Sequence, residues 1–291
     1  MDSIVFEPGK LPVYVCQECL NTHQVHSMMA HMHRDIELIA VLKGSVQCLA
    51  GASVFELHKG DVCFINRGQM HGLYPQAGAE DQHRVLVIGT ALLTQIPGIY
   101  EKYIQSILED TGFSHIRFTG QDSPAAFISR SMDLIEELQK DQPDGYELEI
   151  LSLLYGIISR LYQAYTRGPA LPAEDGNAPI QQRMTEFIYQ NYAQPLSLED
   201  IAAAGSVSRS QCVRLFKQYT QMTPIQFLNH HRLEMSCEKL RQTSDSVAFI
   251  ATSCGIKDQA YFNRLFQRAY GVTPLAYRKS RQDTEKEGLL S

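Results

Sequence analysis

The sequence predicts an α+β protein of two domains, an N-terminal β-barrel with a following helical segment and a C-terminal all-α domain. Three observations lead to this prediction. Short apolar runs separated by glycine and polar residues fill positions 11–90, whereas apolar residues recur at helical spacing after position 180. A segment rich in proline and glycine, residues 167–179, lies between the two patterns. The length of 291 residues also suits two domains.

The composition excludes several classes of protein. Apolar residues make up 44% of the chain and charged residues 20%, the proportions of an ordinary globular protein. No stretch of about 18 or more apolar residues is present, so we expect neither a membrane-spanning helix nor a membrane partner. The first residues contain no basic segment followed by an apolar run, so we expect no secretory signal. The seven cysteines are then expected to be reduced and the protein cytoplasmic.

Six apolar runs predict the strands of the barrel, because strands of small barrels and sandwiches recur about every 8–12 residues. The runs are Leu11–Val15, Ile36–Leu42, Val46–Leu49, Ser53–Leu57, Asp61–Ile65 and Arg84–Ile88. Helical spacing then predicts helices over residues 94–111, 124–139 and 146–165. The apolar face of the last helix is wide enough for both the barrel and a partner, so residues 1–166 are expected to form a two-fold homodimer through these helices.

One group of side chains in the barrel carries the residue types of a binding site. The relevant segments are His31-Met-His33-Arg-Asp-Ile-Glu37, Gly60-Asp61 and Gly68-Gln-Met-His71. They resemble the two motifs of cupin barrels, with departures at Val25, Asn66 and Pro75, where cupins usually have glycine, proline and asparagine. The resemblance implies a cupin-like sensor domain in which His31, His33, Glu37 and His71 lie together.

Three interpretations of this His/Glu cluster are open. His31 and His33 point to the same face of a strand because side chains alternate with a period of two. Three imidazoles and a carboxylate can bind Fe²⁺, Mn²⁺, Ni²⁺ or Zn²⁺, and in metal-dependent cupins this is the ligand set. The same groups can also line a pocket for a polar effector or form a structural hydrogen-bond network. We expect the effector pocket, with no metal and no cofactor.

A second group, Cys16-Gln-Glu-Cys19 with His23 and His26, contains the residue types of a zinc site. Only three residues separate Cys19 from His23, whereas a zinc-finger hairpin has about twelve at this point. We therefore expect ordinary thiols here.

The formal net charge of −6 by itself argues against a protein that binds nucleic acid. Divided after Asn177, however, the chain has 12 basic and 22 acidic residues before the cut, and 14 basic and 10 acidic residues after it. The two net charges are −10 and +4. Unevenly distributed solvated charge would give the same asymmetry. The favoured interpretation is a polyanion-binding domain that follows an acidic domain, with residues 167–179 as the linker.

Residues 180–281 show helix start signals at regular places. Ser197 with Asp200 forms a capping-box pattern that begins a short helix, and Ser208 caps a further helix over Arg209–Tyr219. A helix, a brief turn and a second helix within about 25 residues is typical of a helix-turn-helix unit.

The unit then recurs. Arg214-Leu-Phe-Lys217 returns 50 residues later as Arg264-Leu-Phe-Gln267, and a Thr-Pro pair follows each copy. Because the repeat includes caps, core positions and turns, we expect two helix-turn-helix units joined by one long helix over residues 225–242. The last residues, 282–291, are expected to be a disordered tail.

Five motifs stand out in the C-terminal part. They are Leu196-Ser-Leu-Glu-Asp-Ile-Ala, Arg214-Leu-Phe-Lys, Arg232-Leu, Ile250-Ala-Thr-Ser-Cys-Gly and Asp258-Gln-Ala-Tyr-Phe-Asn-Arg-Leu-Phe-Gln-Arg-Ala-Tyr-Gly-Val-Thr-Pro-Leu-Ala-Tyr-Arg278. With these motifs the C-terminal part resembles the DNA-binding domain of AraC-type (AraC/XylS) transcription regulators. Ser206, Ser236 and Ile256 depart from the glycine, alanine and phenylalanine that are common in the family. The resemblance covers about a third of the chain and implies sequence-specific binding to double-stranded DNA.

A recognition helix places its outward N-terminal residues in the major groove. These are Arg209, Ser210, Val213, Arg214 and Lys217 in the first unit, and Gln259, Ala260, Asn263, Arg264 and Arg268 in the second. By resemblance, residues 210, 213, 214, 259, 260 and 263 read bases, since arginine pairs with guanine and Asn or Gln with adenine. A second interpretation has Arg214 and Arg264 contact only phosphates or pair with nearby acidic residues.

The expected function is that of a ligand-responsive, sequence-specific transcription regulator. Its partners are double-stranded DNA, a small-molecule effector and a second copy of the chain, with RNA polymerase as a further candidate. No catalytic residues are expected, because the sequence lacks a nucleophile motif of known spacing and a phosphate-binding loop. Two alternatives are a metal-dependent cupin enzyme fused to a DNA-binding domain, and a barrel used only for dimerisation.

Overall fold

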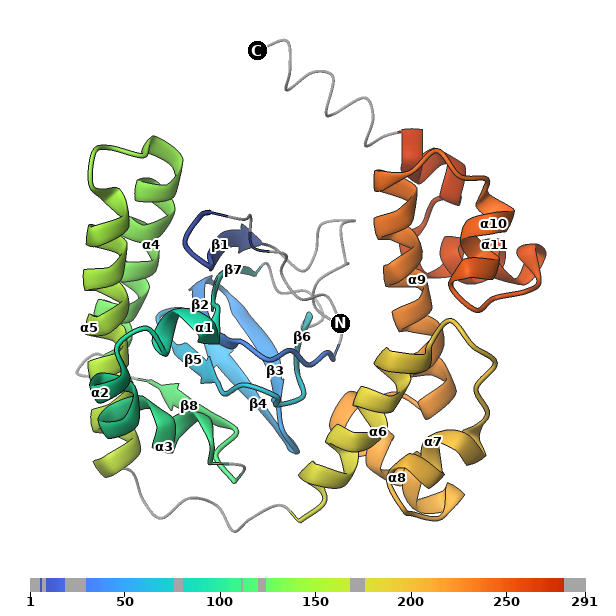
Figure 1. Cartoon of the computed structure of the whole chain (residues 1–291), viewed down its shortest axis with the longest axis horizontal. Coiled ribbons are helices and arrows are strands. Elements are labelled where there is room, and N and C mark those ends of the chain that lie inside the picture. Colours follow the sequence, from blue (N-terminus) through green and yellow to red (C-terminus); the bar gives the residue numbers. More distant parts are fainter. Residues whose placement is uncertain are drawn as a thin grey trace. The chain divides into compact units, whose positions relative to one another are not determined.

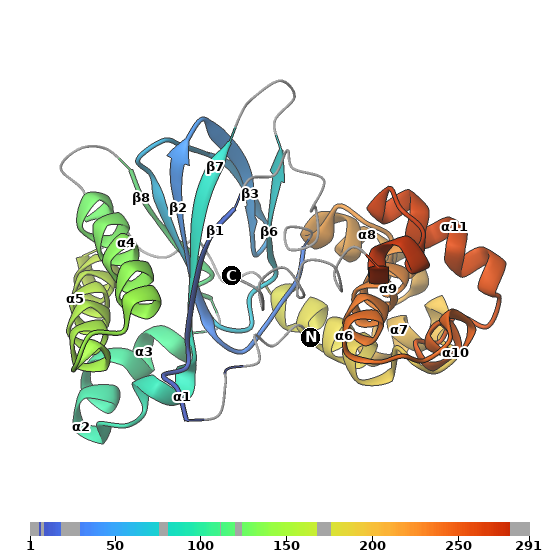
Figure 2. The same ribbon diagram turned by 90° about the horizontal axis from the view of Figure 1, so that it is seen from above.

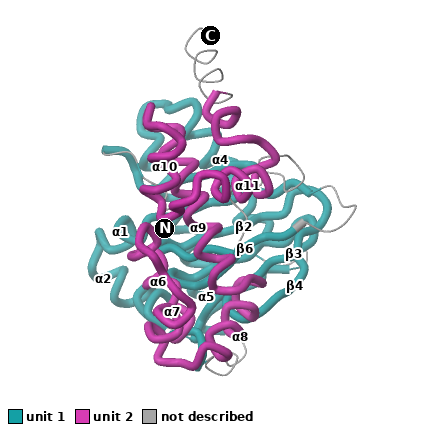
Figure 3. The backbone as a smooth tube through the Cα atoms, turned by 90° about the vertical axis from the view of Figure 1, so that its right-hand side faces the viewer, with its two compact units in different colours: residues 1–21, 28–179 teal, residues 22–27, 180–291 magenta. Residues whose placement is uncertain are grey.

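The computed structural model describes residues 6, 9–18, 30–75, 81–110, 112–119, 124–167 and 176–279. These residues form two compact units that divide between Pro179 and Ile180 (Figure 3). The segment predicted as the linker, residues 167–179, overlaps a helix at each end. One helix ends at Arg167, and the next begins at Ala178. The predicted tail over residues 282–291 lies outside the described residues.

The N-terminal unit is built on two antiparallel sheets (Figure 1). Its strands are β1 (Val13–Glu18), β2 (Ile36–Lys43), β3 (Ser45–Ala50), β4 (Ser53–His58), β5 (Val62–Ile65), β6 (His71–Pro75), β7 (Gln82–Ile88) and β8 (His115–Phe118). Within the described residues, one sheet has the order β1-β7-β2-β5-β8 and the other the order β4-β3-β6. The predicted β-rich domain is therefore present, as two facing sheets in place of one closed ring. Strands β6 and β8 have no counterpart among the predicted runs.

Strand β2 is buried on both faces because it lies between two hydrophobic cores. Ile36 and Leu38 contribute to the core between the five-stranded sheet and the helices, whereas Ile39 and Val41 contribute to the core between the two sheets. Side chains alternate along a strand, so Glu37 shares the face of Ile39 and Val41. The sheet thus places a carboxylate among the apolar residues between the sheets.

Helices cover the other face of the five-stranded sheet (Figure 2). They are α1 (Thr90–Leu93), α2 (Pro97–Ile99), the π-helical segment η1 (Tyr100–Ile104), α3 (Gln105–Leu108), α4 (Ala125–Asp141) and α5 (Tyr146–Arg167). The single helix predicted over residues 94–111 is wrong, since Pro97 begins a new segment and a π turn follows it. Arg84 of β7 donates to Glu136 at 2.8 Å and pairs with Asp133, which ties α4 to the sheet.

The C-terminal unit contains helices at the places where start signals predicted them. They are α6 (Ala178–Asn191), α7 (Leu198–Ala204), α8 (Arg209–Thr220), α9 (Pro224–Gln242), α10 (Val247–Ser253) and α11 (Gln259–Tyr270). Ser197 and Asp200 form the predicted capping box of α7. The N-caps of α8 and α11 are Ser208 and Asp258, whose side chains accept hydrogen bonds from backbone N–H groups of the first turn. Within the described residues, no helix combines the length and apolar character needed to cross a bilayer.

Helix α9 connects the two helix-turn-helix units and also fixes α6. The guanidinium of Arg232 donates to the carbonyl oxygens of Tyr192 at 2.8 Å and Gln194 at 2.7 Å, directly after the end of α6. Two positions that depart from the family pattern are accommodated in this region. The Ser236 hydroxyl donates to the carbonyl of Leu233 at 2.6 Å, and Ile256 is buried in the core of the second unit.

Gly255 and Ser206 occupy equivalent turns of the two units, and both have positive φ angles, 83° and 55°. A Cβ atom on Gly255 would lie 2.5 Å from the Tyr192 oxygen and 2.9 Å from Arg232 Nε. Gly255→Ala is therefore expected to lower the free energy of unfolding of this domain by about 3 kcal/mol, because it combines backbone strain with a disturbed buried hydrogen bond. Ser206→Ala is the matched control, with an expected change below about 0.5 kcal/mol. Urea denaturation followed by circular dichroism measures both, and equal losses would show that the contact with Arg232 is unimportant.

Candidate functional site

The ten residues predicted to face DNA lie on α8 and α11. Nine of them are exposed and Val213 is half-buried. On α8 the opposite face packs into the domain through buried residues such as Leu215 and Phe216, and on α11 through Phe262 and Phe266. Each helix is therefore held by its buried face and exposes its predicted contact residues to solvent, as major-groove recognition requires.

Basic side chains on these two helices are available to a polyanion. Arg209 forms an ion pair with Glu199 at 2.9 Å, but the two side chains are 67% and 57% exposed, so the pair is weak and readily exchanged. Within the described residues, neither Arg214 nor Arg264 has an acidic side chain within 4.0 Å. This geometry argues against the interpretation that these two arginines pair with nearby acids.

The His/Glu cluster comes together between the two sheets of the N-terminal unit. Glu37 lies on β2 and His71 begins β6, whereas His31 and His33 precede β2. The backbone of His31 forms a bridge with that of His71, with hydrogen bonds of 2.8 and 2.9 Å. One potential ligand atom from each of the four side chains lies within 4.8 Å of all the others. His33, Glu37 and His71 are buried, and His31 is half-buried.

Hydrogen bonds to backbone carbonyls orient the two buried imidazoles, those of His33 and His71. His33 Nδ1 lies 3.0 Å from the carbonyl oxygen of Asp35, and His71 Nδ1 lies 2.9 Å from that of Gln69. A carbonyl oxygen only accepts hydrogen bonds, so each Nδ1 carries the proton and donates. The Nε2 atoms then face Oε2 of Glu37, at 3.1 Å from His33 and 3.4 Å from His71.

Charges within the cluster are strongly coupled. Burial alone raises the pKa of Glu37, but His71 and His33 outweigh burial and hold this pKa well below its usual range. Burial lowers the pKa of His71, but the Glu37 carboxylate outweighs it and raises this pKa above the usual value. The cluster is therefore a buried pair of opposite charges, in which the Glu37 carboxylate and the imidazoles stabilise one another's charged forms.

Two buried thiols that the sequence analysis did not single out lie in the same inter-sheet core, Cys48 of β3 and Cys63 of β5. Burial and the neighbouring Cys48 raise the pKa of Cys63 well above its usual value, so its thiol stays protonated. Of the second predicted group, Cys16 lies on β1, and Cys19, His23 and His26 lie outside the described residues. The described cysteines are all free of disulfide bonds.

Two departures from the cupin motifs fall on described residues. Asn66 is buried, and its amide donates to the carbonyl oxygens of Ile107 at 2.8 Å and Phe113 at 3.0 Å. The asparagine therefore holds α3 and the segment after it against the sheet, which proline cannot do because it has no side-chain donor. Pro75 ends β6.

Comparison with known proteins decides the family. A family model described as an AraC-like ligand binding domain matches residues 17–158, and a model described as a helix-turn-helix domain matches residues 201–280. The chain belongs to the AraC family of transcription regulators. This AraC-family protein combines an N-terminal ligand-binding domain with a C-terminal DNA-binding domain.

Relatives of this AraC-family regulator are similar over most of its length. An uncharacterized HTH-type transcriptional regulator of Bacillus subtilis, YdeC, is 26% identical over 275 residues, which cover 93% of this chain and 92% of YdeC. The transcriptional activator RhaS of Escherichia fergusonii is 25% identical over 253 residues, 86% of this chain and 87% of RhaS. A crystal structure of apo ToxT from Vibrio cholerae covers 92% of this chain and 97% of its own, with a TM-score of 0.51. Its sequence identity is 12%, so it shows a shared fold alone.

Glu37→Gln is expected to lower the free energy of unfolding of the N-terminal domain by about 3 kcal/mol, because it removes the charge that two buried imidazoles face. His58 provides a matched control, since it contacts Glu56 at 3.2 Å on the surface of the same domain. His58→Gln is expected to change stability by less than about 0.5 kcal/mol. Thermal and chemical denaturation of the full chain measure both values. A loss as small as that of the control would mean that the Glu37 charge does not stabilise the fold.

Proposed function

We propose that α8 and α11 read the DNA major groove and that the His/Glu cluster is the point at which the N-terminal domain senses its effector. The observation that carries the first part is the repeated N-capped helix with an exposed polar face and a buried apolar face. Ser210, Val213 and Arg214 are the base-reading candidates of α8, and Gln259, Ala260 and Asn263 are those of α11. The basic residues Arg209, Lys217, Arg264 and Arg268 supply phosphate contacts, which give affinity without sequence information.

Helix α9 joins the two units, and its contacts with α7, α8 and α10 support a fixed spacing between the recognition helices. Two helices that enter successive major grooves on one side of DNA are separated by one turn, about 34 Å. The expected binding site is therefore roughly 17–20 base pairs for each copy of the chain. The protein regulates transcription in the cytoplasm and catalyses no reaction in this proposal, with RNA polymerase as its further partner.

The position of the His/Glu cluster supports a sensing role. Its members come from β2 in one sheet, from β6 in the other, and from the segment that bridges to β6. An effector that binds these side chains therefore contacts both sheets at once. Such a ligand shifts the protein between two arrangements only if it prefers one of them, and a contact shared by two sheets provides that preference.

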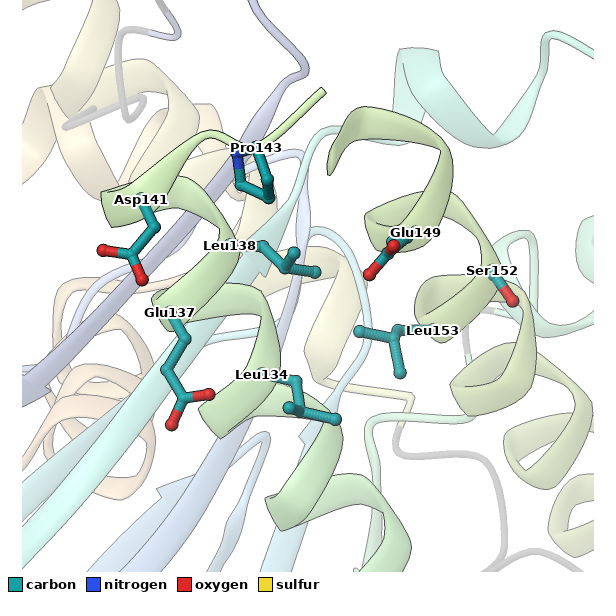
Figure 4. A pocket seen from close by; sticks show the side chains of 8 residues that line it. All are labelled: Leu134, Glu137, Leu138, Asp141, Pro143, Glu149, Ser152 and Leu153. Atoms are coloured by element: carbon teal, nitrogen blue, oxygen red, sulfur yellow. The ribbon is translucent and has the colours of Figure 1, made fainter. Parts of the chain in front are cut away.

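A homodimer through α4 and α5 is the proposed assembly. A surface groove of about 370 Å³ lies between these helices (Figure 4). Leu134, Leu138 and Leu153 line it, together with the acidic residues Glu137, Asp141 and Glu149. Leu148, in the first turn of α5, is 73% exposed. A second copy related by two-fold symmetry would cover this apolar surface, because the same patch then serves both partners.

Arg214→Ala is expected to relax the preference at one base position of the selected site, because a bidentate contact with guanine contributes about 1–3 kcal/mol of discrimination. Lys217→Ala, one turn along the same helix, is the control and is expected to weaken binding to all sequences alike. Selection of bound sites from random DNA with each variant measures both effects. The base-reading role of Arg214 is wrong if its variant also weakens every sequence uniformly.

Leu148→Glu is expected to weaken dimerisation at least tenfold, because it places a charge in the proposed apolar interface. Val54, which is 43% exposed on β4, gives the control Val54→Glu, with no change expected. Sedimentation equilibrium over a range of concentrations gives the dissociation constants. A monomer at all concentrations for the unaltered chain, or equal constants for Leu148→Glu and the unaltered chain, contradicts the proposed dimer.

A further inference from the structure

We propose that two copies of the chain pair through α4 in antiparallel orientation, so that Arg130 of each copy binds the carboxylates of Glu137 and Asp141 in the other. This pairing rests on the proposed homodimer, and it defines the orientation of the two copies and the ion pairs that select that orientation. The observation that supports it is the order of charges along one face of α4.

Helix α4 carries a narrow stripe of side chains, the α4 stripe, whose charge changes along its length. At about 100° per residue, Arg130, Leu134, Glu137 and Asp141 lie within about 60° of one another around the helix, and Leu138 lies about 40° further on. The three charged side chains are exposed and the two leucines are half-buried. Figure 4 shows Leu134 and Leu138 directed toward α5, with Glu137 and Asp141 on the outer side of α4. The stripe therefore begins with a cation and ends with two carboxylates, with leucines between them.

The groove between α4 and α5 needs a basic partner, because Glu137, Asp141 and Glu149 line it. A second copy that covers the groove must compensate these carboxylates, since like charges that meet at an interface repel one another. A two-fold interface uses the same surface of both copies, so the compensating cation must lie on that surface too. Arg130 meets this condition. Within the described residues, its guanidinium has no acidic side chain within 4.0 Å, so its charge is available to a second copy.

The charges of the α4 stripe select one orientation of the two helices. In a parallel pair, Arg130 faces Arg130 of the partner subunit and each carboxylate faces its own counterpart, which is repulsive throughout. In an antiparallel pair with the two-fold axis at Leu134, Arg130 lies level with position 138 of the other copy.

The antiparallel pair brings opposite charges within reach. An α-helix rises about 1.5 Å per residue, so Glu137 of the partner subunit lies about 1.5 Å from Arg130 along the helix axis, and Asp141 of the partner subunit about 4.5 Å. A long guanidinium side chain spans both offsets at the roughly 8–10 Å spacing of packed helices. Leu134 then packs against its own counterpart on the axis, and each dimer contains two equivalent sets of ion pairs.

Charge reversal in the full chain tests the pairing. Arg130→Glu and Glu137→Arg are each expected to raise the Kd of the homodimer at least tenfold, because two-fold symmetry makes every substitution act twice. An equimolar mixture of the two variants is expected to form a heterodimer at least tenfold tighter than either variant's homodimer. In that heterodimer one ion pair has its charges exchanged and the other is unaltered, so both attract. The control is Lys140→Glu, the same change of charge at an exposed position of α4 about 80° around the helix from Arg130, with less than about a threefold change expected.

Sedimentation equilibrium of each variant and of the mixture gives the Kd values, and far-ultraviolet circular dichroism checks that each variant is folded. The differences between variants are expected to shrink at about 0.5 M NaCl, because salt screens the charges that cause them. If Glu137→Arg does not fold, Asp141→Arg replaces it as the complement of Arg130→Glu. If Arg130→Glu does not fold, Arg130→Gln replaces it and is expected to raise the Kd by a smaller factor.

The outcomes separate this pairing from the proposed homodimer. A monomeric unaltered chain overturns both. A dimeric unaltered chain that folded reversal variants leave as tight as before, or a mixture of reversal variants that binds no better than each alone, overturns the antiparallel pairing and leaves the homodimer in place. Restored binding in the mixture, with Lys140→Glu unaffected, supports the pairing.

Discussion

The N-terminal domain depends on the alternation of side chains along β2, the strand that separates two hydrophobic cores. Ile36 and Leu38 face the helices while Ile39 and Val41 face the second sheet, and burial of each contributes about 1.5–3 kcal/mol. A shift of register by one residue would exchange the two faces, so the register is firmly specified. That register also places Glu37 on the inner face, beside His33 and His71. The position of the His/Glu cluster is thus a consequence of core packing.

A buried carboxylate between two sheets is destabilising unless it is compensated. The two imidazoles compensate it, and they are in turn held by the carbonyl groups of Asp35 and Gln69. The chain supplies these groups from β2 of one sheet and β6 of the other, so the proposed effector would contact both sheets at a position that also stabilises the fold.

The fold of the DNA-binding domain depends instead on local sequence signals, N-caps and apolar helix faces, that occur once in each helix-turn-helix unit. Each recognition helix has its own N-cap and its own apolar face, and α9 holds the two units together. The buried guanidinium of Arg232 binds the end of α6 and also packs against Gly255 in the second unit. This one contact explains why the second turn needs glycine while the first tolerates Ser206, which is exposed. The exposed basic residues of α8 and α11 take no part in core packing, so they are available to contact DNA.

The sequence by itself determined the order of domains, the helix starts and the two repeated units, because caps, apolar spacing and charge are local properties of the chain. It also identified the four members of the His/Glu cluster. The whole-chain charge of −6 argued against binding to nucleic acid, and this inference was misleading because the value averages an acidic domain with a basic one. Pro97 was a local signal that the predicted helix over residues 94–111 overlooked. Only the tertiary structure decided the rest: the short strands β6 and β8, the carbonyl groups that orient His33 and His71, and the clash that reserves position 255 for glycine. Each of these depends on groups far apart in the chain or on backbone atoms that every residue shares, so no local pattern of residue types can reveal it.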